Sequence, residues 1–316
     1  MSVKKSHIRL AATVAAVVGA VALLTLPVAV RQPDVGESIV WLPPDPPAAT
    51  TTGKAAADDR DRVPVGTPTP TGAGTPSPEA PALPGATRPG TQPPVVDHGP
   101  RTGNKVALTF DADMTDAMRY QLRSGAVRSY ANLRIIDLLE RERVPATFFL
   151  TGKWVEQYPQ VTRRLAANPR FELANHTYGH LAFTPDCYGL PRLPRQQMTA
   201  DVDRTFEVVT PYGGRQTRYF RFPGLCHDRA ALAALAPLGV TVVDGDVVSG
   251  DPFATSWRPI VRAVLDGVRP GSVVVLHVTE ANAPMTDEAL PHILAGLAER
   301  GLEPAPLSEV LGHIDR

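Results

Sequence analysis

After Pro100, short apolar runs alternate with amphipathic stretches, and this alternation constrains the fold more than any other feature of the chain. Each run is rich in Val, Phe or Leu and has the length of a strand that is buried on both faces. Repeated strand–helix units imply a parallel sheet, either open or closed into a barrel. The expected strands are 105–110, 146–150, 171–175, 218–222, 240–245 and 272–277.

The length of this region favours a barrel that is not complete. A folded part of about 215 residues is slightly short for an eight-fold barrel, which typically takes about 250 residues. We therefore predict an α/β domain over 101–316, built as a distorted, incomplete (β/α) barrel with parallel strands, and keep a doubly wound sheet as the alternative. In both folds reactive residues lie at the carboxyl ends of the strands.

The N-terminus has the pattern of an export signal. Lys4, Lys5 and Arg9 precede an apolar run over 10–30, and about 20 such residues can span a bilayer core of about 30 Å. Basic residues before such a run predict that the rest of the chain is exported. We expect 1–30 to be a signal peptide or an uncleaved signal anchor, and favour the anchor because no clear small-residue cleavage site follows. The protein is then extracytoplasmic, either membrane-anchored or secreted.

Residues 31–100 are rich in Pro, Thr, Ala and Gly and have few large apolar residues. Such a segment cannot bury enough surface to offset the cost of ordering its backbone, so we expect a disordered linker. The formal net charge of the whole chain is +0, which gives no support to nucleic acid as a partner. The sequence predicts membrane contact through the N-terminal segment only.

The chain has two cysteines, Cys187 and Cys226. In an exported protein an even pair favours a disulfide over two free thiols. A metal role is less favoured because neither has a CxxC companion.

Ionisable residues collect where the expected strands end. Because these ends share one rim in either fold, we expect the side chains to converge there. They are Asp111, Asp113, His176, His180, Arg221, Asp244, Asp246, Asp251 and His277.

Two histidines and a carboxylate in this set could bind a metal. His176 and His180 are spaced i, i+4, which would place both on one side of a helical turn. Two histidines with one carboxylate is a ligand set of hydrolytic zinc sites. Arg221 leaves a buried strand and needs a carboxylate partner, whereas His277 taken alone suits an ordinary core histidine.

The order "TFDAD", "HTYGH", "RFPG", "DVVSGD" and "VLH" resembles the five-motif signature of the polysaccharide deacetylases, the carbohydrate esterase group with the NodB-like domain. The resemblance runs from about Lys105 to Arg316. It implies a distorted (β/α) barrel, a divalent metal, usually zinc, and hydrolysis of the N-acetyl group of amino sugars.

The resemblance also implies a role for each motif residue. Asp111 would be the general base that takes a proton from the attacking water, and Arg221 would orient that base and keep it ionised. The amide of Gly224 would help to hold the oxyanion.

By the same resemblance, the remaining motifs would supply the metal ligands and the acid. His176 and His180 would be metal ligands. His277 would be the general acid that protonates the departing amine, and Asp251 the acid that tunes this histidine.

The first motif departs from the family pattern of two adjacent aspartates, the second of which binds the metal. Ala112 occupies that position and cannot coordinate. Either Asp113 replaces it as the third ligand, or Asp111 serves twice, or the metal is weakly held, or activity is lost. On a regular strand Asp111 and Asp113 point to the same side, which favours the first option. In the fourth motif Pro252 replaces an aromatic residue, and Phe253 follows.

The sequence thus predicts metal-dependent hydrolytic removal of N-acetyl groups from a cell-envelope glycan, with peptidoglycan as the favoured polymer. The alternatives are a non-catalytic glycan-binding domain of the same fold and an O-acetyl esterase.

Overall fold

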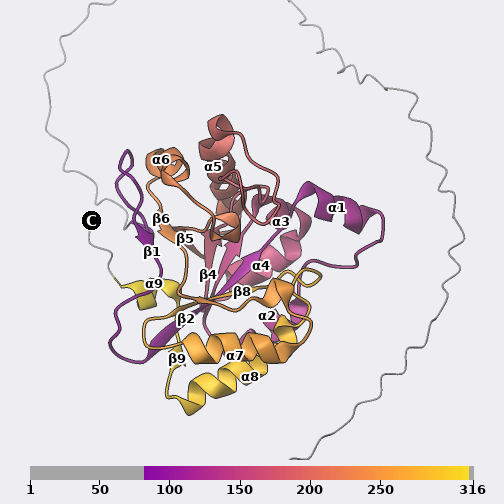
Figure 1. Ribbon diagram of the computed structural model, residues 1–316, viewed down its shortest axis with the longest axis vertical. Helices are drawn as coiled ribbons and strands as arrows, with labels where there is room; N and C mark the ends of the chain where they lie inside the picture. Colours follow the sequence, from indigo (N-terminus) through magenta and orange to yellow (C-terminus); the bar gives the residue numbers. More distant parts are fainter. Residues whose placement is uncertain (1–81, 313–316) are drawn as a thin grey trace, which may run out of the picture. The chain divides into compact units, whose positions relative to one another are not determined.

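Residues 82–312 are described by this computed structural model, and they fold around a sheet of nine strands with parallel pairing throughout (Figure 1). The strand order is β1-β6-β5-β4-β3-β2-β8-β7, and β9 pairs separately with β2. The strands are β1 (Val95–Val96), β2 (Lys105–Ala112), β3 (Ala146–Leu150), β4 (Phe171–Asn175), β5 (Arg215–Phe220), β6 (Thr241–Val243), β7 (Val247–Val248), β8 (Val273–His277) and β9 (Glu303–Pro304).

The barrel is open, because no pairing among residues 82–312 joins β7 to β1 at the two ends of the sheet. This confirms the incomplete (β/α) barrel predicted from the sequence. The six longer strands coincide with the six expected runs to within a few residues. The three additional strands have two residues each, which is too short for hydrophobic periodicity to mark them.

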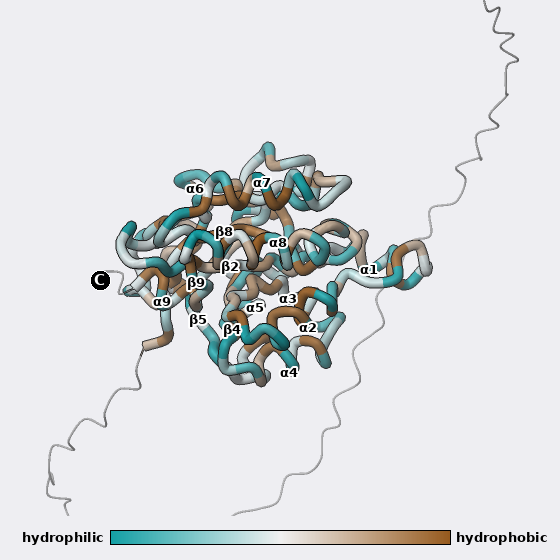
Figure 2. Tube along the Cα trace, turned by 90° about the horizontal axis from the view of Figure 1, so that it is seen from below, coloured by the Kyte–Doolittle hydropathy of each residue, from teal (hydrophilic) through white to brown (hydrophobic). Residues whose placement is uncertain are grey.

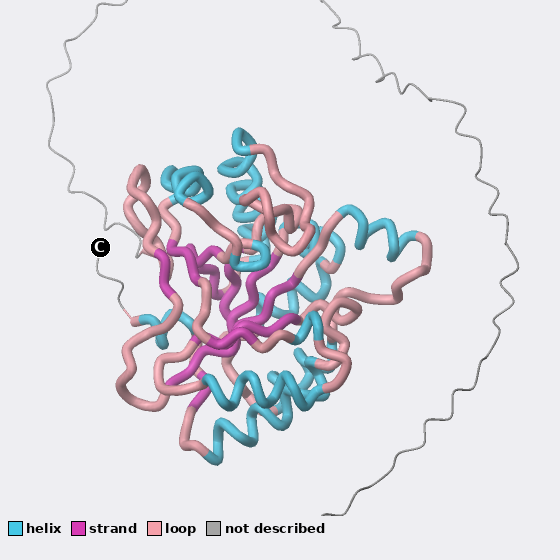
Figure 3. Tube along the Cα trace, viewed as in Figure 1, coloured by secondary structure: helices cyan, strands magenta, loops and turns pink. Residues whose placement is uncertain are grey.

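Helices surround the strands (Figure 3). Hydrophobic and hydrophilic segments alternate along their chain trace (Figure 2), as expected for helices that cover a sheet with one face. They are α1 (Asp116–Arg123), α2 (Leu133–Arg141), α3 (Gly152–Gln157), α4 (Pro159–Ala167), α5 (Met198–Val209), α6 (Arg229–Leu235), α7 (Trp257–Gly267), α8 (Thr286–Glu299) and α9 (Leu307–Leu311).

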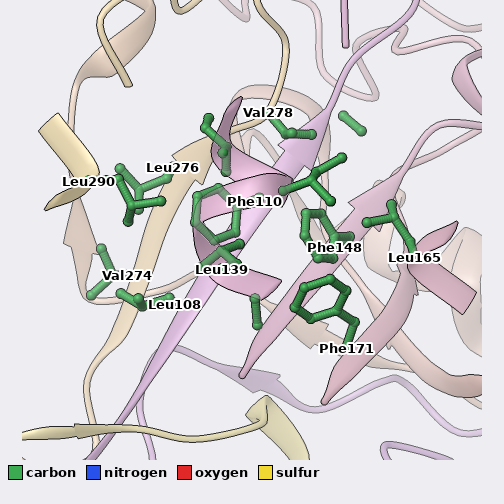
Figure 4. Close-up of a cluster of buried hydrophobic side chains, with 14 of the residues drawn as sticks. Leu108, Phe110, Leu139, Phe148, Leu165, Phe171, Val274, Leu276, Val278 and Leu290 are labelled. Atoms are coloured by element: carbon green, nitrogen blue, oxygen red, sulfur yellow. The ribbon is translucent and has the colours of Figure 1, made fainter. Parts of the chain in front are cut away.

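The largest part of the core lies between the central strands and the helices (Figure 4). Phe110 of β2, Phe148 of β3 and Phe171 of β4 form a row, with ring centroids 5.6 and 5.1 Å apart along the row. Leu139 of α2 and Leu165 of α4 belong to the same buried cluster. Since side chains alternate along a strand, this packing fixes which residues of β2 face the helices and which face the barrel interior.

The folded part begins earlier than the sequence predicted. β1, which falls in the expected linker, pairs with β6, and the backbone N–H of Arg218 donates a 2.7 Å hydrogen bond to the carbonyl of Pro84. The expected linker end at Pro100 is therefore too late. The Pro-rich composition of this segment did not predict that it is ordered. Backbone hydrogen bonds are its main contacts with the sheet, and composition does not reveal such bonds.

Two other expectations concern the chain ends and the cysteines. The predicted export segment 1–30 and most of the linker lie outside the described residues. No helix within 82–312 is both long and apolar enough for a membrane span. Cys187 and Cys226 form a disulfide with their Cα atoms 5.9 Å apart, which confirms the pairing favoured by the sequence.

Candidate metal and catalytic site

A pocket of about 460 Å³ opens at the carboxyl ends of the strands, where the sequence placed the reactive residues. Asp111, Asp113, His176, His180 and His277 all line it. Arg221 and Asp251 lie fully buried behind these side chains. All seven residues proposed from the motifs therefore converge on one site.

Asp113, His176 and His180 form a compact cluster in this pocket. One potential ligand atom from each residue lies within 4.8 Å of the others. The Oδ1 atom of Asp113 is 3.5 Å from Nε2 of His176 and 3.3 Å from Nε2 of His180. This Oδ1 atom is buried and accepts no hydrogen bond from the residues that the structure describes. Such an orphaned carboxylate oxygen between two imidazoles fits a divalent cation, because one carboxylate and two histidines is a known zinc ligand set.

The protonation of the cluster also suits a cation. Burial opposes ionisation of Asp113, but the nearby His180, His176 and His277 outweigh it and hold the pKa of Asp113 well below its usual range. Burial is the main cause that lowers the pKa of His180 to about 4. His180 is therefore neutral at pH 7, as a metal ligand must be.

The ring of His176 is oriented by the backbone. Its Nδ1 atom lies 2.9 Å from the carbonyl oxygen of Arg221. Because a carbonyl can only accept, Nδ1 carries the hydrogen and Nε2 presents its lone pair to the pocket.

The loop that carries the two histidines is not the helical turn that the sequence suggested. Residues 176–180 form irregular backbone after β4, with positive φ angles of 70° at Thr177 and 54° at His180. The N–H of His180 donates to the hydroxyl of Thr177 at 3.0 Å, and the two histidine rings lie with centroids 5.0 Å apart. A side-chain hydrogen bond and left-handed backbone, neither of which the i, i+4 spacing reveals, therefore bring the rings together.

Ala112 lies on the opposite face of β2 from the site. It is fully buried in the core cluster that contains Phe110, whereas Asp111 and Asp113 both face the histidines. The alternation of the strand continues one residue past its end, so Asp113, unlike Ala112, points its carboxylate toward the two histidines.

Asp111 is held by a buried guanidinium. Nη1 of Arg221 donates to Oδ1 of Asp111 at 2.7 Å and to the hydroxyl of Thr109 at 2.9 Å, while Nε donates to the Val243 carbonyl at 3.0 Å. The guanidinium also lies over the ring of Phe149, 4.0 Å from its centroid. The expected carboxylate partner of Arg221 is therefore Asp111. Its second oxygen, Oδ2, lies 3.7 Å from Nε2 of His176.

His277 is held by Asp251 on the other side of the cluster. Oδ1 of Asp251 lies 2.8 Å from Nδ1 of His277, and Oδ2 accepts the backbone N–H of His277 at 2.8 Å. The hydroxyls of Ser249 and Thr286 also donate to this carboxylate, at 2.8 and 2.7 Å. Nε2 of His277 is left facing Asp113, 3.9 Å from Oδ2.

The surrounding carboxylates set the charge of His277. Burial lowers the pKa of this histidine, but Asp251, Asp113 and Asp111 outweigh that effect and raise it to about 10. His277 therefore carries a proton at neutral pH and can donate it from Nε2.

Some of the strand-end residues singled out by the sequence do not join the site. Asp244 pairs with His227, with 2.9 Å between Oδ2 and Nε2, and Asp246 accepts from Arg101 at 2.7 Å. Conversely, sequence reasoning missed Thr286, because a threonine at the start of a distant helix carries no local signal.

Comparison with known proteins identifies relatives of this chain. A family model described as "Polysaccharide deacetylase" matches residues 98–243. A chitooligosaccharide deacetylase from Sinorhizobium fredii is 30% identical over 177 residues, which cover 53% of this chain and 79% of the relative. A peptidoglycan-N-acetylglucosamine deacetylase from Bacillus cereus is 27% identical over 204 residues, covering 64% of this chain and 66% of the relative. Among solved structures, a CE4 family pseudoenzyme from Bacillus anthracis superposes with a TM-score of 0.55 at 21% identity, covering 70% of each chain.

Proposed function

This chain belongs to the polysaccharide deacetylase family of hydrolases, and on that premise we propose that it removes N-acetyl groups from amino sugars of a cell-envelope glycan with the help of a divalent cation. Peptidoglycan is the favoured polymer and zinc the favoured cation. The relatives named above as chitooligosaccharide and peptidoglycan deacetylases support an N-acetylated glycan as the substrate.

The arrangement of two proton-transfer groups carries the proposal. Asp111 and His277 flank the Asp113–His176–His180 cluster, and each is fixed by its own buried partner, Arg221 or Asp251. A domain that only binds glycan has no need for a base and an acid held in this way.

The reaction divides between these groups. Asp111, whose Oδ1 is occupied by Arg221, accepts the proton of the attacking water at Oδ2. His277, held as a cation by Asp251, donates the Nε2 proton to the nitrogen of the departing amine. Gly224 lines the same pocket, and its amide is our candidate donor to the oxyanion.

Asp113, His176 and His180 would hold the cation. When bound, it supplies the Lewis acidity that polarises a carbonyl and lowers the pKa of water.

The location is part of the proposal. The apolar run at 10–30 after Lys4, Lys5 and Arg9 supports export of the catalytic domain, either anchored in the membrane or secreted. A cell-envelope polymer is then the glycan that this domain meets.

A panel of substrates tests the function. Chelator-treated protein, with and without added zinc or cobalt, is incubated with N-acetylglucosamine oligomers, peptidoglycan and O-acetylated xylan, and the released acetate is measured. We expect cation-dependent release from an N-acetylated substrate, and a loss on the order of 10²- to 10⁴-fold in Asp111→Asn. Asp203→Asn, an exposed acid on α5, is the matched control.

Two outcomes would overturn the proposal. Release from xylan alone would identify an O-acetyl esterase. No release from any substrate with any cation would favour the non-catalytic glycan-binding domain.

A further inference from the structure

Exposed hydrophobic side chains gather at the mouth of the catalytic pocket. Seven large hydrophobic residues are exposed among residues 82–312, and three of them, Tyr188, Val248 and Phe253, line this one pocket. Tyr188 and Phe253 are 75% and 76% exposed. Leaving two aromatic rings in water gives up the free energy of burying them, so their concentration at a functional pocket indicates a ligand that covers them.

Tyr188 holds this position in spite of its backbone conformation. It has φ 50° and Gly189 has φ 72°, and the N–H of Leu190 donates to the carbonyl of Cys187 at 2.9 Å. Turns with positive φ at both central residues favour Gly, Asn and Asp, so a tyrosine here is strained. Strain of this kind persists where the surroundings enforce it, and it concentrates at functional positions.

Two neighbours enforce the turn. The disulfide from Cys187 to Cys226 ties it to the loop that follows Arg221. At Gly224 a Cβ atom would lie 2.9 Å from Cδ2 of Tyr188 and 2.7 Å from Sγ of Cys187. The glycine therefore leaves the space that lets the tyrosine ring lie over the pocket wall.

Phe253 reaches the same place from another part of the chain. It follows Asp251 by two residues, and its ring centroid lies 6.0 Å from that of Tyr188, with 35° between the planes. This separation is within the range of interacting aromatic pairs. The Asp251 side chain, held by His277, Ser249 and Thr286, fixes the start of this segment.

Tyr188 also borders a second hollow on its far side, together with Pro185, Asp186 and Gly189. Tyr188 therefore lines both the catalytic pocket and a neighbouring depression. A glycan that extends from the pocket toward this depression would contact its ring.

We propose that Tyr188 and Phe253 form an aromatic platform that binds a pyranose ring next to the sugar that is deacetylated, so that the protein selects oligomers over single amino sugars. This inference rests on the proposed function. A pyranose ring offers flat C–H faces to an aromatic surface, and Asp111, His176 and His277 line the same pocket as the two aromatic rings.

Kinetics on two substrates test the platform. Tyr188→Ala and Phe253→Ala are compared with wild type on an N-acetylglucosamine pentamer and on 4-nitrophenyl acetate, which carries no pyranose ring. We expect KM for the pentamer to rise by about 3- to 10-fold in each variant, with kcat and the hydrolysis of the small ester unchanged. Tyr188→Phe, which keeps the ring, should behave as wild type, and so should Tyr120→Ala, an exposed tyrosine on α1.

Two results would overturn the platform: an unchanged KM for the pentamer, or an equal loss on both substrates, which would indicate a merely structural role.

Calorimetric binding of the same pentamer to the chelator-treated protein separates this inference from the proposed function. If wild type binds the pentamer but releases no acetate, the proposed function fails, and weaker binding by both alanine variants still supports the platform. No detectable binding by wild type would refute the platform.

Discussion

Replacing Arg221 with methionine should destabilise the protein far more than an ordinary loss of one ion pair. Arg221 is 0% exposed, and its partner Asp111 is 4% exposed. The substitution removes the hydrogen bonds to Asp111, Thr109 and Val243 and leaves a buried carboxylate without its cation. Loss of one partner from a buried pair costs about 3–5 kcal/mol, so we expect the free energy of unfolding to fall by that amount.

Urea unfolding of the chelator-treated protein at pH 7 measures this difference. Arg134→Met is the matched control, because Arg134 also pairs with carboxylates, Glu280 and Asp287, but its side chain is 62% exposed. We expect that control to lose less than about 1 kcal/mol. In the double variant Arg221→Met/Asp111→Asn no uncompensated charge remains, so part of the lost stability should return. A loss below about 1 kcal/mol in Arg221→Met, or a double variant that loses the sum of the two single losses, would refute the reasoning.

Three further predictions concern the metal, the acid and pH. Asp113→Ala should lose most of the zinc that wild type retains after dialysis, measured by mass spectrometry, and unchanged zinc content would rule out Asp113 as a ligand. His277→Gln should lower kcat for acetate release about 10²-fold or more while the zinc content stays the same; a normal kcat would exclude His277 as the acid. The hydrogen bond that His227 donates to Asp244 raises the pKa of this histidine above its usual 6.5, so the stability from this pair is complete below about pH 6.5 and is lost as pH rises through the raised value. The difference in urea midpoint between wild type and His227→Gln should therefore shrink on going from pH 6 to alkaline pH, and a constant difference would contradict the pairing.

Much of the fold was predictable because buried parallel strands carry a strong local signal. The expected run 272–277 contains β8, and 146–150 coincides with β3, because each is a continuous apolar segment of strand length. β1 could not be found in this way. Its two valines lie in a Pro-rich segment and are held in the sheet by pairing with β6, which only the folded chain supplies.

The convergence of the site was predictable from strand ends, but its detail was not. Placing Asp111, His176 and His277 on one rim needs only the rule that parallel strands end on the same side. The hydroxyl of Thr286 on Asp251 and the approach of Tyr188 to Gly224 are contacts between segments far apart in the sequence. No spacing or periodicity encodes such contacts.

The conformation of the histidine loop shows where a spacing rule fails. The i, i+4 separation of His176 and His180 suggested a helical turn, but Thr177 and His180 adopt positive φ. A spacing gives the distance along the chain, and several backbone paths can bring the same two rings together.

The most direct measurement compares acetate with free amine from an N-acetylglucosamine oligomer treated with zinc-loaded wild type and Asp111→Asn protein. We expect equal amounts of both products from wild type, loss of both on chelation, recovery on adding zinc, and a fall on the order of 10²- to 10⁴-fold in the variant. Acetate without matching amine, or equal rates in wild type and Asp111→Asn, would contradict N-deacetylation by this site.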